Sequence, residues 1–108
     1  MSVLDDQYNK TVNDQRDYLA KLQEAFNQHC DSITAEAQKK LAAIPEKNLE
    51  ERKKVFDDQK KQLDEALAQL KKEIDNSHNQ VRKKLEEIHR QREEERIKQL
   101  EQIMDKFR

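Results

Sequence analysis

The sequence predicts an all-α protein: an antiparallel helical hairpin, coiled-coil-like, with two long helices and a turn near Pro45. Three observations lead to this prediction: glycine is absent and proline occurs once, 42% of the residues are charged, and apolar residues recur every 11 positions. Sheets with tight turns need glycine and proline, whereas long helices and coiled coils are rich in charged side chains. We expect residues 1–108 to form a single helical-hairpin domain.

The first helix is expected over residues of about 3–44. Its apolar and small residues fall into three columns spaced by 11 residues, which is three helical turns, so they form one nearly straight stripe. The columns are Leu4, Gln15, Phe26 and Ala37; Tyr8, Leu19, Cys30 and Leu41; and Thr11, Leu22, Ile33 and Ile44. Pro45 ends this helix, because proline lacks a backbone N–H and clashes with the preceding turn.

The second helix is expected over residues of about 48–107. Asn48 followed by Glu51 fits the N-cap pairing that starts a helix. The same 11-residue spacing then gives three more columns: Phe56, Leu67, His78, His89 and Leu100; Gln59, Leu70, Val81, Arg92 and Ile103; and Leu63, Ile74, Leu85, Arg96 and Phe107. The columns keep their phase across the charged segment 89–96, HRQREEER, so this segment is also predicted to be helical.

A break near residues 75–78 is the alternative to one long second helix. Ser77 and Gln80 resemble a second capping box, which would begin a third helix. The chain would then form a three-helix bundle instead of a hairpin. The apolar columns cross this site without a shift in phase, which favours continuity.

A short turn makes the helices antiparallel, so residues whose numbers add to about 93 should lie opposite one another. This rule pairs apolar residues repeatedly, for example Phe26 with Leu67. It also pairs Gln15 with His78, which predicts a buried polar layer that sets the register of the two helices. Cys30, the only cysteine, is expected to be a buried structural residue.

The second helix is longer than the first, so residues 89–108 are expected to overhang without cover from the same chain. The overhang carries an apolar face formed by Ile97, Leu100, Ile103, Met104 and Phe107. Large apolar side chains left in water forfeit favourable burial energy. A second copy of the chain would cover them, so the sequence predicts self-association into a four-helix homodimer.

Composition and motifs argue against several other functions. The 22 basic and 23 acidic residues give no basic footprint for nucleic acid, so no nucleic-acid partner is expected. Catalysis needs groups that converge in a pocket, which a solvated two-helix seam seldom provides, so we expect no enzyme and no cofactor. Glu86 with His89, and Asp75 with His78, have the spacing of bundle metal ligands, but the further carboxylates of such a site are missing, and no metal site is expected.

The function expected from these residues is a non-catalytic oligomerisation module, scaffold or adaptor that binds a partner helix through its C-terminal apolar face. Arg92 and Arg96 are expected to add charge selectivity at the edge of that face. The chain is expected to be cytoplasmic and without a membrane span, because no long apolar run occurs. The alternative is an amphipathic protein that binds lipid surfaces, which also use 11-residue repeats.

Overall fold

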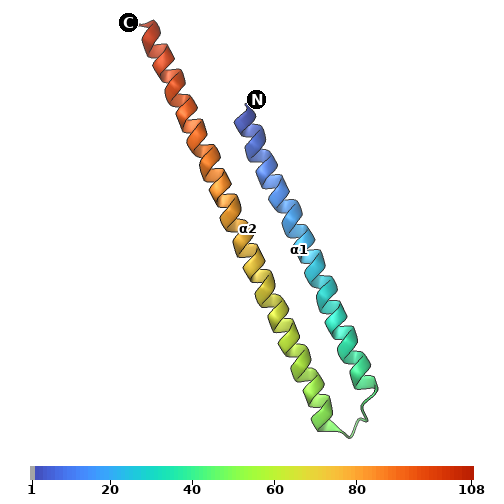
Figure 1. Ribbon diagram of the computed structural model, residues 1–108. Helices are drawn as coiled ribbons and strands as arrows, with labels where there is room; N and C mark the ends of the chain where they lie inside the picture. Colours follow the sequence, from blue (N-terminus) through green and yellow to red (C-terminus); the bar gives the residue numbers. More distant parts are fainter. Residues whose placement is uncertain (1) are drawn as a thin grey trace. The chain divides into compact units, whose positions relative to one another are not determined.

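The computed structural model describes residues 2–108 and contains two α-helices, α1 Val3–Ala42 and α2 Leu49–Lys106 (Figure 1). No strand occurs in these residues. The all-helical architecture of two long helices is therefore as predicted and is consistent with a helical hairpin. The chain divides into two units, which we call the turn unit, Leu19–Asp75, and the terminal unit, the described part of Met1–Tyr18 together with Asn76–Arg108.

The start of α1 is capped as its sequence suggests. The Ser2 hydroxyl oxygen accepts a hydrogen bond from the backbone N–H of Asp5 at 3.1 Å, which satisfies one of the free donors of the first turn. Asp5 and Asp6 lie in this first turn, and Lys39 and Lys40 lie in the last. Acidic residues at the N-terminus and basic residues at the C-terminus both complement the helix dipole.

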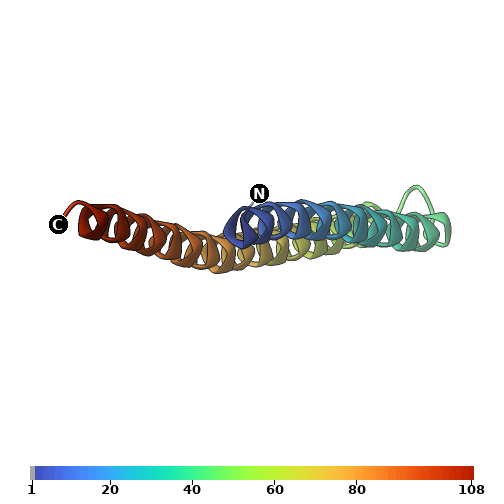
Figure 2. The same ribbon diagram turned by 90° about the horizontal axis from the view of Figure 1, so that it is seen from above.

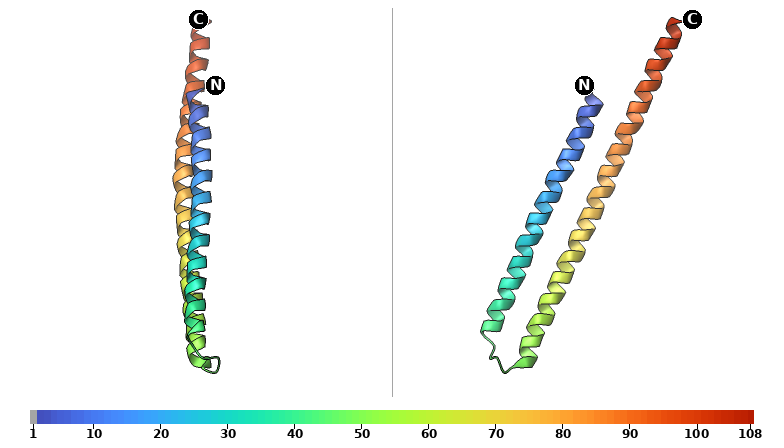
Figure 3. Two further views of the ribbon diagram at one scale, coloured as in Figure 1. Left: turned by 90° about the vertical axis from the view of Figure 1, so that its right-hand side faces the viewer. Right: turned by 180° about the vertical axis from the view of Figure 1, so that it is seen from behind.

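In the turn unit, α1 and α2 lie side by side and are joined by residues 43–48 (Figures 1 and 3). The side-chain oxygen of Asn48 accepts a hydrogen bond from the backbone N–H of Glu51 at 3.4 Å, which confirms the predicted cap. Arg52 donates from Nη1 to the carbonyl oxygens of Leu41 at 3.2 Å and Ile44 at 3.4 Å. The Leu41 carbonyl lies at the end of α1 and also accepts the backbone N–H of Ile44 at 3.1 Å, and the Ile44 carbonyl lies just beyond α1. Arg52 therefore ties the two helices together beside the turn.

The second helix is not broken at residues 75–78, because α2 continues through them. Ser77 is buried within the helix and is not a cap, so the three-helix alternative is not the observed fold. The charged segment 89–96 is helical as predicted.

The predicted stripe of α1 is confirmed by the burial of its side chains. Leu4, Ile33 and Ala37 are buried, and the other members of the three columns are half-buried except Tyr8, which is 39% exposed. Cys30 is half-buried, so the expectation of a buried cysteine is wrong. A seam between only two helices leaves one side of each contact open to water, which explains why few side chains are fully covered.

One predicted column of α2 is wrong by one residue. The expected column of Phe56, Leu67, His78, His89 and Leu100 is exposed, and the covered residues are instead Val55, Ala66, Ser77 and Ile88. The other two columns are half-buried until α1 ends, as predicted. Two of the four residues that replace the expected column, Ala66 and Ser77, are small, and small side chains let two helix backbones approach closely. Hydrophobicity alone favoured the bulkier Phe56 and Leu67, which the structure places outside the seam.

The polar pair expected to set the register lies within the terminal unit. Gln15 and His78 line the same shallow hollow, together with Val81 and Leu85. Gln15 is half-buried but His78 is exposed, so the two residues do not form a buried polar layer. The buried polar residue of α2 is Ser77, next to His78 in the sequence. Whether Gln15 and His78 influence the register stays a prediction.

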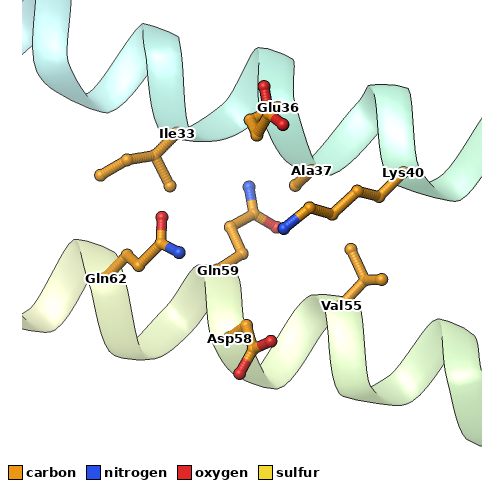
Figure 4. Close-up of a pocket in the computed structure, with 8 residues that line it drawn as sticks. All are labelled: Ile33, Glu36, Ala37, Lys40, Val55, Asp58, Gln59 and Gln62. Atoms are coloured by element: carbon orange, nitrogen blue, oxygen red, sulfur yellow. The ribbon is translucent and has the colours of Figure 1, made fainter.

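Figure 4 shows how tightly the seam of the turn unit closes. Ile33 and Ala37 on α1 point towards Val55, Gln59 and Gln62 on α2. The space between them is about 20 Å³, which is room for about one water molecule. The seam is therefore packed at its centre and bordered by amide side chains that remain in contact with water.

Candidate docking surface at the end of α2

The last part of α2 extends beyond the start of α1 within the terminal unit (Figures 1 and 2). Ile88 is buried, Gln91 and Arg92 are half-buried, and every residue of 93–108 is exposed. Cover from α1 therefore reaches Arg92, a few residues further than the sequence predicted. The uncovered overhang is residues 93–108 rather than 89–108.

Five large apolar side chains lie on this overhang, and we call them the tip face. They are Ile97, Leu100, Ile103, Met104 and Phe107, with exposures between 51% and 85%. Spacings of three and four residues place them on one side of the helix. Burying such a side chain is worth about 1.5–3 kcal/mol, so this surface has a strong tendency to find cover. Its binding to a partner stays a prediction.

Arg92 holds the start of α1 against α2. Its Nη2 donates a hydrogen bond to Oδ1 of Asp5 at 2.5 Å, and its guanidinium lies 5.1 Å from the centre of the Tyr8 ring. The sequence reasoning missed this contact, because the numbers 5 and 92 add to more than the 93 of the pairing rule. Opposite charges near the end of the seam were the signal that could have revealed it. The predicted role of Arg92 in selecting a partner stays a prediction, and the arginine is already bound within its own chain.

The Asp5 carboxylate makes this contact sensitive to acid. The side chain of Ser2 and then the charge of Arg92 lower the pKa of Asp5 below its ordinary value of 3.8. The contact therefore stabilises the fold fully above that pH and is lost as the pH falls through the pKa of the folded state. We expect an NMR titration of the Tyr8 ring to show an acidic transition that Asp5→Asn abolishes. An unchanged transition in Asp5→Asn would mean that another carboxylate controls the ring.

The charged segment before the tip face is held by ion pairs within α2. Arg90 pairs with both Glu87 and Glu94, and these carboxylates raise its pKa further above the ordinary range. The same hydrogen bonds from Arg90 are the first cause that lowers the pKa of Glu87. Arg96 pairs with Glu93 at 3.1 Å, one turn away. Pairs at three- and four-residue spacing support a helix in water, so the overhang can stay helical without a partner.

A metal site and a membrane-spanning helix are two further features that residues 2–108 could contain. No three His, Cys, Asp or Glu side chains gather there in a group able to hold a metal ion. Glu86 and His89 therefore have no third side chain of this kind beside them in this part of the chain. Neither helix in this part of the chain has a stretch apolar enough, at the necessary length, to cross a membrane.

The fold and the tip face define a protein of two long helices whose second helix presents an exposed apolar surface. The chain matches no family model, no curated protein and no solved structure. The exposed surface at the end of α2 is therefore the feature that bears on function.

Proposed function

We propose that this protein is a non-catalytic helical module that self-associates and binds a partner helix through the tip face. The observation that carries the proposal is the set of five large apolar side chains that α1 does not reach. Helices with an apolar stripe bind by laying that stripe into a groove between or along other helices. A scaffold or adaptor role follows, because the rest of α2 beside the stripe is polar and suited to water.

The energy available from one tip face is similar in size to the cost of association. Full burial of five large side chains at about 1.5–3 kcal/mol each gives at most about 7.5–15 kcal/mol, while association itself costs about 4–15 kcal/mol. A partner with a similar stripe doubles the favourable term. A polar partner surface would leave little net affinity, so the partner must offer an apolar helix face.

The experiment that tests the proposal replaces Leu100, Ile103 and Phe107 together by alanine. We expect the molecular mass measured by sedimentation to fall to that of one chain, with the dissociation constant raised by at least about a hundredfold. Alanine is the best helix former, so the helix content measured by circular dichroism should persist. The control is the pair Leu49→Ala and Phe56→Ala, which removes exposed apolar side chains in the turn unit.

Two outcomes would contradict the proposal. The first is an unchanged mass in the triple variant when the wild-type protein is an oligomer. The second is a wild-type protein that stays a single chain but partitions strongly into lipid vesicles. The second result would support the lipid-binding alternative.

A further inference from the structure

We propose that the occupant of the tip face is the tip face of a second copy of this chain, in antiparallel orientation. This inference depends on the proposed function and specifies its partner. Two features of the tip face decide whether it fits the tip face of a second copy: the spacing of its apolar side chains and the charges beside them. The apolar spacing fits a second copy in either direction, and the position of Glu93 in the stripe favours the opposite direction.

The apolar spacing is self-complementary. Ile97, Leu100, Met104 and Phe107 are separated by three, four and three residues, which is the spacing of a two-helix seam. In an antiparallel pair, Ile97 would lie opposite Phe107 of the second copy, and Leu100 opposite its Met104. The two-fold symmetry repeats both contacts, so the pair has four layers without a polar residue. Ile103 would lie beside the two-fold axis, next to Ile103 of the second copy.

Two of the three flanking charges match in the same register. Glu94 lies at the beginning of the tip segment and Arg108 directly after it, two residues beyond α2, and the helical spacing places both on the same flank of the stripe. Antiparallel pairing brings each Glu94 near Arg108 of the second copy, which forms two ion pairs. Glu101 lies midway between them on this flank and faces Glu101 of the second copy, which is one like-charge contact at the two-fold axis. The Glu94 and Arg108 side chains are exposed, and their present partners, Arg90 and Asp105, lie within α2. Exposed pairs of this kind are weak, so they can be exchanged for pairs between chains.

A parallel pair is disfavoured by Glu93. This residue lies four positions before Ile97 and continues the same stripe. In a parallel pair, Glu93 would face Glu93 of the second copy in the next layer of the seam, and like charges at such a position are repulsive. In the antiparallel pair the two Glu93 residues lie at opposite ends.

The first test reverses the charges of the proposed ion pair in the full chain. Glu94→Lys and Arg108→Glu, each alone, should raise the dissociation constant of the dimer by about tenfold at low salt, since each places two like-charge contacts in the interface. The double variant restores both ion pairs and should recover most of the affinity. The matched control is Glu95→Lys, which makes the same change of charge on the opposite side of α2 and should leave the dissociation constant within about twofold.

The second test determines the direction of the two helices by disulfide cross-linking. In a Cys30→Ser background, a chain carrying Glu94→Cys is mixed with a chain carrying Arg108→Cys and oxidised. Antiparallel pairing predicts a mixed disulfide between the two chains. In a parallel pair, positions 94 and 108 are separated by 14 residues along the helix, about 21 Å, so no mixed disulfide forms. A dimer that gives no mixed disulfide, or single charge reversals that the double variant fails to rescue, would overturn the antiparallel pairing.

These results separate the inference from the proposed function. If the triple alanine variant becomes a single chain while the charge variants and cross-links contradict antiparallel pairing, the docking role of the tip face stands and this partner is wrong. If the wild-type protein is a single chain at every concentration, this inference and the self-association in the proposed function are both wrong.

Discussion

Replacing Ile88 by aspartate is expected to lower the free energy of unfolding by at least about 3 kcal/mol. Ile88 is 7% exposed and lies beside Thr11 and Gln7 of α1, in the last well-covered turn of α2. Removing a buried isoleucine side chain down to alanine already costs about 2–5 kcal/mol, and a carboxylate in that position must also lose water. The start of α1 should therefore separate from α2 in the terminal unit.

The matched control is His89→Asp, one residue further along the same helix. His89 is exposed, so the same new carboxylate stays in water and should change the free energy of unfolding by less than about 0.5 kcal/mol. Urea unfolding followed by circular dichroism measures both variants, and hydrogen exchange of the backbone amides near Leu4 locates the change. Equal effects at 88 and 89 would contradict the observed face of α2, and a larger effect at 89 would support the face expected from the sequence.

The features that the sequence predicted correctly are those fixed by local chemistry. Pro45 cannot continue a helix, and Asn48 can cap one, so the position of the turn follows from two residues. The stripe of α1 follows from an 11-residue repeat that the burial of Leu4, Ile33 and Ala37 confirms. The continuity of α2 across residues 75–78 also follows from this repeat, because a break would have shifted its phase.

Hydrophobicity pointed to different faces at different places along α2, because Ile88 beside His89 favours the observed face and the pairs nearer the turn favour the other. Val55 and Phe56 are neighbours, as are Ala66 and Leu67, and either member of each pair keeps the 11-residue spacing. The sequence reasoning chose the more hydrophobic members. The structure chooses the smaller ones, because the distance between two helices depends on the size of the side chains between them. How closely two helices pack depends on the side chains of both, so the spacing of residues within one helix cannot predict it.

The tip face could be predicted from the sequence only in part. Its five residues follow from the spacing along α2, and the structure places all of them outside the cover of α1. Cover ends beside the start of α1, where Arg92 contacts Asp5, and this contact joins residues far apart in the sequence. The identity of the partner lies outside a single chain, so it rests on the complementarity of the surface and on the experiments above.

The same substitution at two isoleucines should separate folding from association. Ile33 is 6% exposed in the closed seam of the turn unit, whereas Ile97 is 53% exposed on the tip face. Ile33→Ala is expected to lower the free energy of unfolding by about 2–3 kcal/mol, near the lower end of the usual range because water can reach one side of the seam. Ile97→Ala removes the same atoms from an uncovered site, so the single chain should lose less than about 0.5 kcal/mol.

The measurement is urea unfolding at low and at high protein concentration. Stability that depends on concentration reports association, because a partner that binds only the folded chain stabilises it by mass action. Ile33→Ala should shift the unfolding midpoint at both concentrations, while Ile97→Ala should reduce only the extra stability gained at high concentration. If Ile97→Ala were as destabilising as Ile33→Ala in dilute protein, the end of α2 would have to be covered by its own chain. The tip face could not then be a docking surface, since the side chains that drive docking would already be buried.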